Sequence, residues 1–523
     1  MHLATVIELA SQRYPRAEAI IDGCRRFTYE EWNQRINSVA WGLRRLGLKP
    51  GERIAICARN SEPAITAYFA AHKAGLTAVL LSTRWKNTEI AHALNDAEIR
   101  LIFHDETTSA QVIKALPSSR HNAAAVPLDM EVFHTAGKTT FGHLTAYPRG
   151  YPPEITRDDS SVGTILYTSG TLGRPKGVQR THRSDYYAAL ALIIQHRWTP
   201  FERTLGVMPF FHTMGLHCLL SMVVLNGLAV VLPNFDAALC MDCIEKERLT
   251  ALYLVPTVYY DLTAQSDFDT KRLSSIKKLA FAGAPMSQFL VEQCFRTINP
   301  EVFVNQYGST EMHAITINPD LRNKPASCGR PALHSHIRIV AADASRRVLP
   351  CEEVPPGEVG EIIVQADSPQ AFCGYLNRPD ANERSIREGW YFTGDLGCLD
   401  EEGDLFFKGR LDDMIISGGE NVYPQEVEAV LLSHPQVSDT AVVGLPDERW
   451  GEKITAVIVP ASPDLDDAAL DEFCLASSGL PRFMRPRQYI YVNEIPKSPT
   501  GKILRSRIRS LLLPQLTDKR IFL

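Results

Sequence analysis

The stretch GTILYTSGTLGRPKG, residues 163–177, joins a short apolar run to a turn rich in glycine and hydroxyl groups. The apolar run at 163–167 is typical of a strand that is buried on both faces. Backbone N–H groups in the turn that follows can surround an anion, and Lys176 adds a positive charge. The order differs from the common nucleotide P-loop, because Gly177 stands where Ser or Thr would follow the lysine. We therefore predict a strand that ends in an unusual phosphate-binding loop.

Apolar runs of strand length recur on both sides of this loop and alternate with segments of helical periodicity. We expect strands at residues 53–57, 78–81, 101–103, 163–167, 205–208, 229–232, 251–254, 278–282 and 302–305. We expect helices at residues 29–46, 62–74, 184–195, 215–225 and 287–296. This alternation predicts an α/β fold with parallel-rich sheets and helices on their faces.

The character of the chain changes near residue 330. Segments at 336–340 and 360–364, punctuated by Pro, Gly and acidic residues, indicate a small β subdomain at about 330–409. The tail alternates strands at 441–444, 455–459 and 489–492 with helices at 425–432 and 468–476, which predicts a small α+β domain. A chain of 523 residues is too long for one core. We therefore expect a large domain at 1–409, a hinge at 410–412 and a small mobile domain at 413–523.

Composition argues against several classes of protein. The chain has 55 Lys and Arg against 60 Asp and Glu, so no overall basic field is available to hold nucleic acid. The hydrophobic fraction of 45% and the charged fraction of 22% are ordinary for globular domains. The start, MHLATVIELA, has no basic region before an apolar block, so we predict an amphipathic helix of a cytoplasmic protein instead of a signal peptide. The most apolar stretch, 216–233, contains polar residues and an Asn-Gly turn, so we expect no membrane span.

Three further motifs offer groups suited to a nucleotide. Gly283-Ala284-Pro285 and Tyr307-Gly308-Ser309-Thr310-Glu311 each follow an apolar strand, at the edge where ligands bind in open α/β sheets. Tyr307 can stack on a purine, Thr310 can hydrogen-bond a carboxylate or phosphate oxygen, and Glu311 is a hard oxygen ligand suited to Mg²⁺. Asp395, in YFTGDL, is expected on a tight turn where its carboxylate can accept from two ribose hydroxyls.

Together with three other stretches in the same order, these motifs resemble the adenylate-forming (ANL) superfamily of acyl- and aryl-CoA ligases over roughly residues 25–505. The others are PFFHTMG at 209–215, GRLDDMIISGGENVYP at 409–424 and PKSPTGK at 496–502. The resemblance implies an ATP-dependent carboxylic acid:CoA ligase. The acid would attack the α-phosphorus of ATP to give an acyl-adenylate and pyrophosphate, and the thiol of CoA would then displace AMP.

The resemblance also implies roles for individual residues. Lys502 would reach the α-phosphate and the carboxylate during adenylation, Glu311 would hold Mg²⁺, and Asp412 would be the hinge. The catalytic residues would be Lys502, Thr310, Glu311 and His212. The ATP-binding residues would be Thr168, Ser169, Gly170, Thr171, Gly173, Lys176, Gly283, Ala284, Pro285, Tyr307, Asp395, Arg410 and Lys502.

Within the superfamily the tail is most similar to the 4-chlorobenzoate CoA ligase type, at residues 410–424 and 447–451. In that type a Trp at the position of Trp450 lies along the pantetheine arm of CoA, and glycines permit its close approach. Arginines here are suited to the 3′-phosphate of CoA. The implied CoA-binding residues are Arg84, Gly418, Gly419, Trp450, Phe483, Arg485 and Arg487. The small domain would rotate about Asp412 between the two steps. This rotation would remove Lys502 from the active site and bring the face at Gly418 and Gly419 to it.

Family position also implies the residues that line the acid pocket. They are His212, Thr213, Met214, Tyr259, Ala284, Gln306, Gly308, His313 and Ala314. In the chlorobenzoate type the positions of Gln306 and His313 are apolar, so a simple halobenzoate is disfavoured. Because a buried polar group needs a partner, we expect an aromatic or medium-sized acid with a hydroxyl or another polar substituent.

The expected small-molecule partners are therefore a carboxylic acid, ATP with Mg²⁺, and CoA as cosubstrate. We expect no nucleic acid, and the family suggests a homodimer. Two alternatives stay open: a free-standing adenylation enzyme that loads a carrier protein, and a catalytically inactive member that acts as a binding protein. A phosphotransferase is disfavoured by the order of the loop around Lys176.

Overall fold

A computed structural model of the chain describes residues 1–129, 139–146, 150–168, 175–264, 269–343, 346–477, 479–497 and 503–513. The chain divides into two compact units. Unit 1 comprises Met1–His336 and Val364–Gly389, and unit 2 comprises Ile337–Ile363 and Trp390–Leu523. Each unit has hydrophobic clusters of its own, so each is described by itself.

The first sheet of unit 1 has six strands in the order β6-β5-β3-β4-β7-β8. Its strands are β3 (Arg53–Cys57), β4 (Thr77–Leu80), β5 (Ile99–His104), β6 (Ala124–Pro127), β7 (Val162–Thr168) and β8 (Lys176–Thr181). Neighbouring strands are parallel except β8, which is antiparallel to β7. Strand β4 is buried at every position and apolar from Ala78 to Leu80, as expected of a strand covered on both faces. The predicted phosphate loop thus begins where β7 ends.

The second sheet of unit 1 has nine strands in the order β15-β14-β13-β12-β11-β9-β10-β1-β2. Its strands are β1 (Glu18–Asp22), β2 (Arg25–Thr28), β9 (Arg203–Gly206), β10 (Leu228–Val231), β11 (Ala251–Leu254), β12 (Lys278–Ala282), β13 (Val302–Tyr307), β14 (Thr316–Asn318) and β15 (Arg330–Pro331). The strands from β13 to β1 are parallel, whereas β2, β14 and β15 run antiparallel to their neighbours. The carboxyl ends of the parallel strands therefore share one edge.

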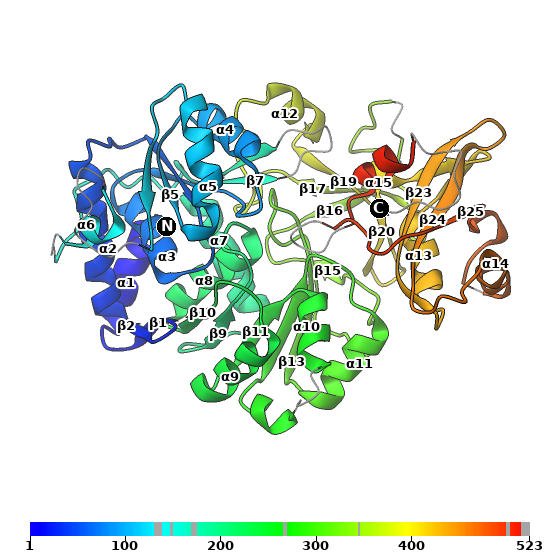
Figure 1. Ribbon diagram of the computed structural model, residues 1–523, viewed down its shortest axis with the longest axis horizontal. Coiled ribbons are helices and arrows are strands. Elements are labelled where there is room, and N and C mark those ends of the chain that lie inside the picture. Colours follow the sequence, from blue (N-terminus) through cyan, green and yellow to red (C-terminus); the bar gives the residue numbers. More distant parts are fainter. Residues whose placement is uncertain are drawn as a thin grey trace. The chain divides into compact units, whose positions relative to one another are not determined.

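Helices cover both faces of these sheets. Helix α3 (Glu62–Lys73) contacts strands of both sheets, α7 (His182–Gln195) packs on the first sheet and on α8 (Thr213–Leu225), and α8 packs on the second. Helices α4 (Asn87–Asp96) and α5 (Glu106–Ala115) cover the other face of the first sheet. Helices α9 (Ala237–Glu247), α10 (Pro256–Thr263) and α11 (Gln288–Thr297) lie together beside the second sheet (Figure 1). The remaining helical elements and one short strand are α1 (Leu3–Arg13), α2 (Tyr29–Arg45), α6 (Phe141–Thr145), α12 (Pro379–Ser385), the 3₁₀ turns Leu116–Ser118 and Thr270–Leu273, and β18 (Ile386–Arg387).

Large buried side chains fill the layer between the sheets. Trp32 of α2 and Tyr68 of α3 are fully buried. The Trp32 indole donates to the hydroxyl of Thr66 at 2.9 Å, and the Tyr68 hydroxyl lies 3.0 Å from that of Thr164 in β7. Because their polar atoms are satisfied, both rings contribute their apolar area without an unpaired buried group.

Unit 2 has two small sheets. The first contains β16 (Ile337–Val340), β17 (Gly360–Gln365), β19 (Trp390–Leu399) and β20 (Leu405–Arg410). The second contains β21 (Ile415–Ser417), β22 (Glu420–Val422), β23 (Val437–Asp447), β24 (Gly451–Pro460) and β25 (Gln488–Tyr491). Its helices are α13 (Pro424–Leu432), α14 (Asp467–Ala476) and α15 (Arg505–Leu512), with 3₁₀ turns at Leu411–Asp413 and Arg482–Met484. The core of the tail packs α13 and α14 against the second sheet.

The predicted fold class is confirmed, and each predicted strand and helix has a counterpart whose ends differ by a few residues. The apolar stretch at 216–233 forms α8, a left-handed residue at Asn226 and β10. Among the described helices, none has the length and apolar composition needed to cross a membrane. One local prediction is wrong: Asp395 lies within strand β19, opposite Arg410 of β20, and not on a tight turn. The glycine before it, Gly394, has φ of +70°, so the glycine bends a strand that continues beyond it.

Three histidines that meet where α1, α3 and α7 pack together predict sensitivity to acid. The ring of His182 lies 3.6 Å from that of His2 and 4.9 Å from that of His72. Burial lowers the pKa of His2 to about 4 and that of His182 to about 3. Below its ordinary pKa of 6.5 the unfolded chain therefore takes up protons that the folded chain cannot hold, and stability is lost as the pH falls from 6.5 towards 4.

We expect the free energy of unfolding of the first unit to be about 2 kcal/mol lower at pH 5 than at pH 7.5 through His2 alone. Urea unfolding at pH 7.5 and pH 5 checks this. The matched variant His2→Asn keeps a side chain that can cap α1 and should lose less stability between the two pH values. An equal loss in the variant and the parent would contradict the assignment.

Candidate active site

Two of the predicted motifs begin side by side at the carboxyl edge of the nine-stranded sheet. Strands β12 and β13 are parallel neighbours, and Ala282 lies opposite Gln306. The loop Gly283-Ala284-Pro285 and the loop that starts at Gly308 therefore leave adjacent strands at the same level. A Cβ atom on Gly308 would lie 1.5 Å from the carbonyl oxygen of His313, so only glycine lets the second loop close on itself.

The carboxylate of Glu311 is fixed within this edge. Glu311 is 8% exposed, and its Oε1 accepts a hydrogen bond of 2.7 Å from the hydroxyl of Tyr375. The Nζ of Lys176 lies 4.3 Å from the centre of the same tyrosine ring. A lysine of the predicted phosphate loop and a predicted metal ligand thus contact the ring and the hydroxyl of one side chain.

The ends of the phosphate loop are held by the hairpin of β7 and β8. Thr168 and Lys176 are opposite each other in the antiparallel pair, at the end of the hairpin where the chain connects the two strands. Four predicted ATP-binding residues, Ser169, Gly170, Thr171 and Gly173, lie outside the described residues. Thr168 and Lys176, which flank these residues, lie at the carboxyl end of β7, so the loop starts and ends there.

A buried ion network fixes the backbone of the loop that contains Thr310. Arg180 is fully buried, and it donates to the carbonyl oxygen of Thr310 at 3.0 Å and to Oδ1 of Asp185 at 2.5 Å. The Nε2 of His217 lies 3.0 Å from the same carboxylate. Burial alone would raise the pKa of Asp185, but the Arg180 charge and the His217 hydrogen bond hold it well below its usual range. The guanidinium therefore stays paired while it fixes the backbone of Thr310.

His313 is buried and adopts an unusual backbone conformation. Its φ is +57°, and its ring lies 4.2 Å from that of His217. Burial, followed by the nearby charges of His217 and Arg180, lowers the pKa of His313 well below its ordinary value, so the imidazole is neutral. Its Nε2 has no hydrogen-bond partner among the described residues. Strained backbone of this kind persists where surrounding structure holds it, often at functional sites.

Gln306 is oriented by a second histidine. The Nε2 of His196 lies 3.1 Å from Oε1 of Gln306, and the amide oxygen can only accept, so the imidazole donates. Burial lowers the pKa of His196 to about 4, with partial compensation by this hydrogen bond. Ala314 is buried on the same loop as His313. Tyr259 is also fully buried, with its hydroxyl 3.1 and 2.9 Å from the carbonyl oxygens of Leu252 and Ala280, so that hydroxyl is engaged with backbone.

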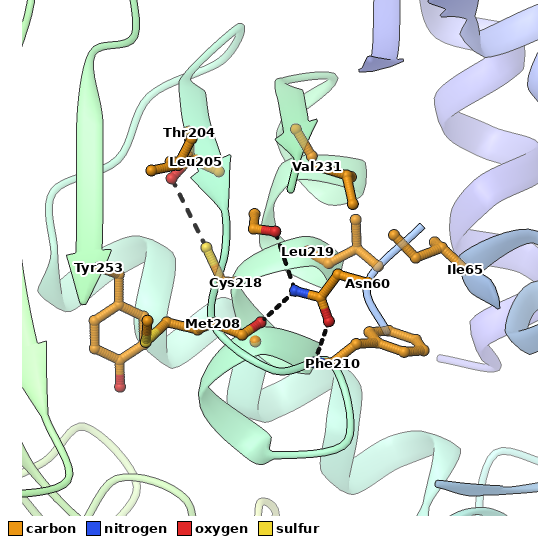
Figure 2. Close-up of a pocket in the computed structure, with 13 residues that line it drawn as sticks. Asn60, Ile65, Thr204, Leu205, Met208, Phe210, Cys218, Leu219, Val231 and Tyr253 are labelled. Atoms are coloured by element: carbon orange, nitrogen blue, oxygen red, sulfur yellow. Dashed lines mark hydrogen bonds between the residues drawn. The ribbon is translucent and has the colours of Figure 1, made fainter. Parts of the chain in front are cut away.

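Asn60, which follows β3, fixes the segment that leads to His212. Figure 2 shows its hydrogen bonds to Met208 and Phe210. The Asn60 amide donates to the carbonyl oxygens of Gly206 and Met208 at 3.1 and 2.8 Å and accepts from the N–H of Phe210 at 2.8 Å. These residues line a cavity of about 20 Å³, which is room for one water. His212 is the half-buried N-cap residue of α8, followed by the half-buried Thr213 and Met214. Asn60 thus sets the position from which α8 starts.

In unit 2, Asp395 and Arg410 form an ion pair between adjacent strands. The Nη1 of Arg410 lies 2.6 Å from Oδ1 of Asp395 and 3.1 Å from the carbonyl oxygen of Thr393. Glu361 accepts from the N–H of Gly394 at 3.0 Å, which holds the bend in β19. Asp395, predicted to contact ribose, and Arg410, predicted to bind ATP, are therefore brought together.

Trp450 is the centre of a second cluster in unit 2. The N–H of Gly418 donates to the carbonyl oxygen of Trp450 at 2.8 Å, and a Cβ on Gly418 would lie 3.0 Å from the indole. The guanidinium groups of Arg449 and Arg487 lie 4.8 and 5.6 Å from the ring centre. Burial, then the nearby Arg485, lowers the pKa of Arg487.

The other residues predicted to bind CoA lie at two places. Phe483 is 41% exposed, and Arg485 pairs with Asp471, so both lie in unit 2 with Trp450. Arg84 is exposed and follows β4 in unit 1. All the predicted CoA-binding residues except Arg84 thus lie in the same unit as Trp450.

The predicted hinge lies next to a residue that contacts a buried ion pair. Asp412 is in the 3₁₀ turn Leu411–Asp413. Arg505, at the start of α15, lies 2.6 Å from Oε2 of the buried Glu428 and 3.3 Å from Oδ2 of Asp413. Lys502 itself lies outside the described residues, and Lys497 and Ile503 form a bridge across the base of its loop.

The family of AMP-binding enzymes matches residues 7–376, and the C-terminal domain of that family matches residues 426–502. The chain belongs to this family. It is 33% identical to a 4-chlorobenzoate–CoA ligase of Arthrobacter sp over 99% of this chain and 97% of that protein. It is also 33% identical to a feruloyl-CoA synthase of Amycolatopsis sp over 95% of this chain and 96% of that protein. The o-succinylbenzoate coenzyme A synthetase of Bacillus subtilis, solved with ATP and magnesium ion, has a TM-score of 0.83 at 28% identity over 96% of this chain and 98% of that one.

Membership of the AMP-binding enzyme family confirms the recognition of an adenylate-forming chain. It also confirms the predicted enzyme class, an AMP-forming acid–CoA ligase. The proposed roles of single residues, the domain boundaries at 409–413 and the acid remain predictions.

The residues of this AMP-binding enzyme fit a magnesium ion that is bound mainly through its substrate. Mg²⁺ in nucleotide sites usually takes one or two carboxylates, with phosphates and water as its other ligands. Glu311 offers such a carboxylate, with one oxygen already oriented by Tyr375. Within the described ranges, no three His, Cys, Asp or Glu side chains are grouped so that they could hold a metal by themselves. The donor set therefore fits Mg²⁺ with ATP and does not fit an all-protein metal cage.

Sequence reasoning missed the residues that support the site. Asn60, Arg180 and Tyr375 are polar or aromatic residues at or beside strands that lead to the edge. Asn60 could have been found, because it follows the predicted strand at 53–57 at its carboxyl end. Arg180 and Tyr375 gave no such signal, since their partners in the site loop, Thr310 and Glu311, are distant in the sequence.

Proposed function

We propose that this AMP-binding enzyme joins an aromatic or medium-sized carboxylic acid, one with a polar substituent, to CoA through an acyl-adenylate. The observation that best supports this is the adjacency of the two loops at Gly283 and Gly308, with Glu311 held by Tyr375 at the same edge. Such an edge is where ligands bind in open α/β sheets. The ion pair of Asp395 and Arg410 offers a partner for the ribose.

In the first half-reaction an acid oxygen attacks the α-phosphorus of ATP, a P–O bond forms, and pyrophosphate leaves with the electrons of the broken P–O bond. The approach of two anions is the obstacle, so positive charge and N–H donors near the phosphorus lower the barrier. Lys502, Lys176 and the loop that begins at Thr168 would supply them. Thr310, whose backbone is fixed by Arg180, would hydrogen-bond the reacting oxygens. When bound, Mg²⁺ on Glu311 would neutralise phosphate charge.

In the second half-reaction the CoA sulfur attacks the acyl carbon, a thioester forms, and AMP leaves with the oxygen that came from the acid. The narrow pantetheine arm needs a wall with little side chain, which Gly418 and Gly419 offer beside Trp450. Arg485, Arg487 and Arg84 are suited to the 3′-phosphate. Lys502 would leave the site when the small domain rotates about Asp412.

Gln306 and His313 are the basis for proposing a polar substituent on the acid. The oxygen of Gln306 is engaged by His196, which orients its amide as a hydrogen-bond donor. We expect Gln306→Leu to lower kcat/KM for a hydroxybenzoate by roughly 10-fold, because the polar group loses its buried partner. The unsubstituted benzoate serves as the control and should change little. Competition between the two acids for one enzyme measures the ratio, and an unchanged ratio would contradict the role of Gln306.

The proposed function is tested by CoA-dependent release of AMP with a panel of aromatic and aliphatic acids. The proposal requires AMP release with CoA and at least one acid of the aromatic or medium-sized class. Release with a phosphopantetheinyl carrier protein but not with free CoA would favour the carrier-loading alternative. No AMP with any acid would favour an inactive member of the family.

A further inference from the structure

We propose that Tyr375 is a positioning residue that couples the lysine of the phosphate loop to the carboxylate of Glu311. The inference rests on the proposed function, because it assigns Lys176 to the phosphates and Glu311 to the metal. Its new content is that one tyrosine orients both groups. The ammonium of Lys176, which would meet the phosphates, and the carboxylate of Glu311, which would meet the metal, are thereby placed relative to each other before ATP binds.

The side chain of Tyr375 makes two different contacts. Its hydroxyl donates to Oε1 of Glu311 at 2.7 Å, and Nζ of Lys176 lies 4.3 Å from the centre of its ring. Tyr375 is 3% exposed, so both contacts are shielded from water. A hydrogen bond to a charged group and a cation–π contact are both stronger when they are desolvated.

The backbone around Tyr375 fixes where this side chain stands. Residues 372–376 form a short crossing segment that pairs with β8: Val178 and Tyr375 form a bridge, and the N–H of Leu376 donates to the carbonyl oxygen of Gly177 at 2.8 Å. On its other side the N–H of Phe372 donates to the backbone carbonyl oxygen of Glu311 at 2.8 Å. The crossing segment thus joins the strand that begins at Lys176 to the loop of Glu311.

A residue of α12 holds the tyrosine from a third direction. The amide oxygen of Asn382 accepts from the N–H of Tyr375 at 2.7 Å, and its nitrogen donates back to the carbonyl oxygen of Tyr375 at 3.3 Å. Gly374, before it, has φ of +119°, and a Cβ there would meet the Asn382 amide at 3.3 Å. The backbone N–H and carbonyl of Tyr375 are therefore both engaged by one amide side chain.

This arrangement restricts the carboxylate of Glu311 to one orientation. Because Oε1 accepts from the hydroxyl, the carboxylate cannot turn freely, and no hydrogen bond to Oε2 occurs among the described residues. A metal ligand that is oriented in advance binds more tightly than one that must be ordered on binding. The ring face independently attracts the lysine ammonium, so removal of the hydroxyl and removal of the ring should have different effects.

Tyr375→Phe removes the hydroxyl and keeps the ring, whereas Tyr375→Leu removes both contacts. Binding of ATP without acid is measured by calorimetry, first with EDTA and then across a series of Mg²⁺ concentrations. For Tyr375→Phe we expect the Mg²⁺ concentration at half-maximal enhancement of ATP binding to rise roughly 10-fold, with metal-free ATP binding unchanged. For Tyr375→Leu we expect metal-free ATP binding to weaken as well, through Lys176.

Tyr167→Phe is the matched control. The hydroxyl of Tyr167 donates to Oδ2 of Asp96 at 2.7 Å in the same unit, so this variant loses a tyrosine–carboxylate hydrogen bond of equal length away from Glu311. Its Mg²⁺ requirement should match that of the parent. In a Glu311→Gln background, Tyr375→Phe should cause no further change in that requirement.

Three results would overturn the inference. They are an equal Mg²⁺ shift in Tyr167→Phe, an unchanged Mg²⁺ requirement in Tyr375→Phe, and a loss of metal-free ATP binding in Tyr375→Phe as large as in Tyr375→Leu. Thermal unfolding of each variant shows whether it is folded, and the Phe variant decides the question if the Leu variant is not. If the parent binds no ATP under any condition, the proposed function fails together with the inference.

Discussion

Replacement of Lys502 by Ala should abolish formation of the acyl-adenylate and leave formation of the thioester from supplied acyl-AMP intact. The first step brings an anionic acid against an anionic phosphate, and one well-placed positive donor there is worth about 10²–10³ in rate. The second step has no such encounter, because the acyl group already has AMP as its leaving group. Exchange of labelled pyrophosphate into ATP measures the first step, and AMP release from synthetic acyl-AMP with CoA measures the second.

The control for this experiment is Lys497→Ala, at the other end of the same loop. The Nζ of Lys497 lies 2.6 Å from Oδ2 of Asp439, so this lysine is engaged with the tail domain itself. Its loss should affect both steps only slightly. Equal loss of both steps in Lys502→Ala would contradict the division of labour, and full pyrophosphate exchange in that variant would contradict the role of Lys502.

Replacement of Gly418 by Ala should have the opposite pattern, with thioester formation lost and adenylation retained. Gly418 has φ of +62°, and an added Cβ would lie 3.0 Å from the Trp450 ring. The methyl group therefore displaces the indole from the wall of the proposed pantetheine channel and strains the backbone. A substrate misplaced by about 1 Å can lose about 100-fold in rate. We expect a loss of that order in the CoA step.

Gly403→Ala separates this effect from backbone strain. Gly403 has φ of +85° in unit 2, but an added Cβ would have no neighbour within 4 Å. Its variant should retain both steps. If Gly418→Ala formed thioester at the parental rate, the glycine face would not line the CoA channel. If Gly418→Ala lost pyrophosphate exchange as well, adenylation and thioester formation would not depend on separate faces of the small domain.

Much of the α/β framework could be predicted from sequence because its strands are continuous apolar runs. The runs at 251–254 and 278–282 became β11 and β12 without any change of bounds, since the buried centre of each strand is a continuous run of apolar or aromatic residues. Asp395 was predicted wrongly on a turn because its neighbour Gly394 is a turn residue by propensity. Its pairing with Arg410 on β20 overrides that propensity.

The positions of the site loops could also be predicted, but the contacts that orient their side chains could not. The sequence marks Glu311 and Lys176 through their motifs, whereas Tyr375 joins them only because residues 372–376 return to β8 after a long excursion. In the same way, no pattern links Gln306 with His196, which are 110 positions apart. Contacts of this range depend on tertiary packing and leave no periodic signal.

The central claim, that an acid oxygen attacks the α-phosphorus of ATP, is tested most directly with acid labelled with ¹⁸O in its carboxylate. After complete turnover with CoA, mass spectrometry measures the label in each product. The account predicts one ¹⁸O atom in AMP and none in pyrophosphate, because the oxygen that attacks phosphorus leaves with AMP when the thioester forms. Label in inorganic phosphate or pyrophosphate, or AMP without label, would contradict it.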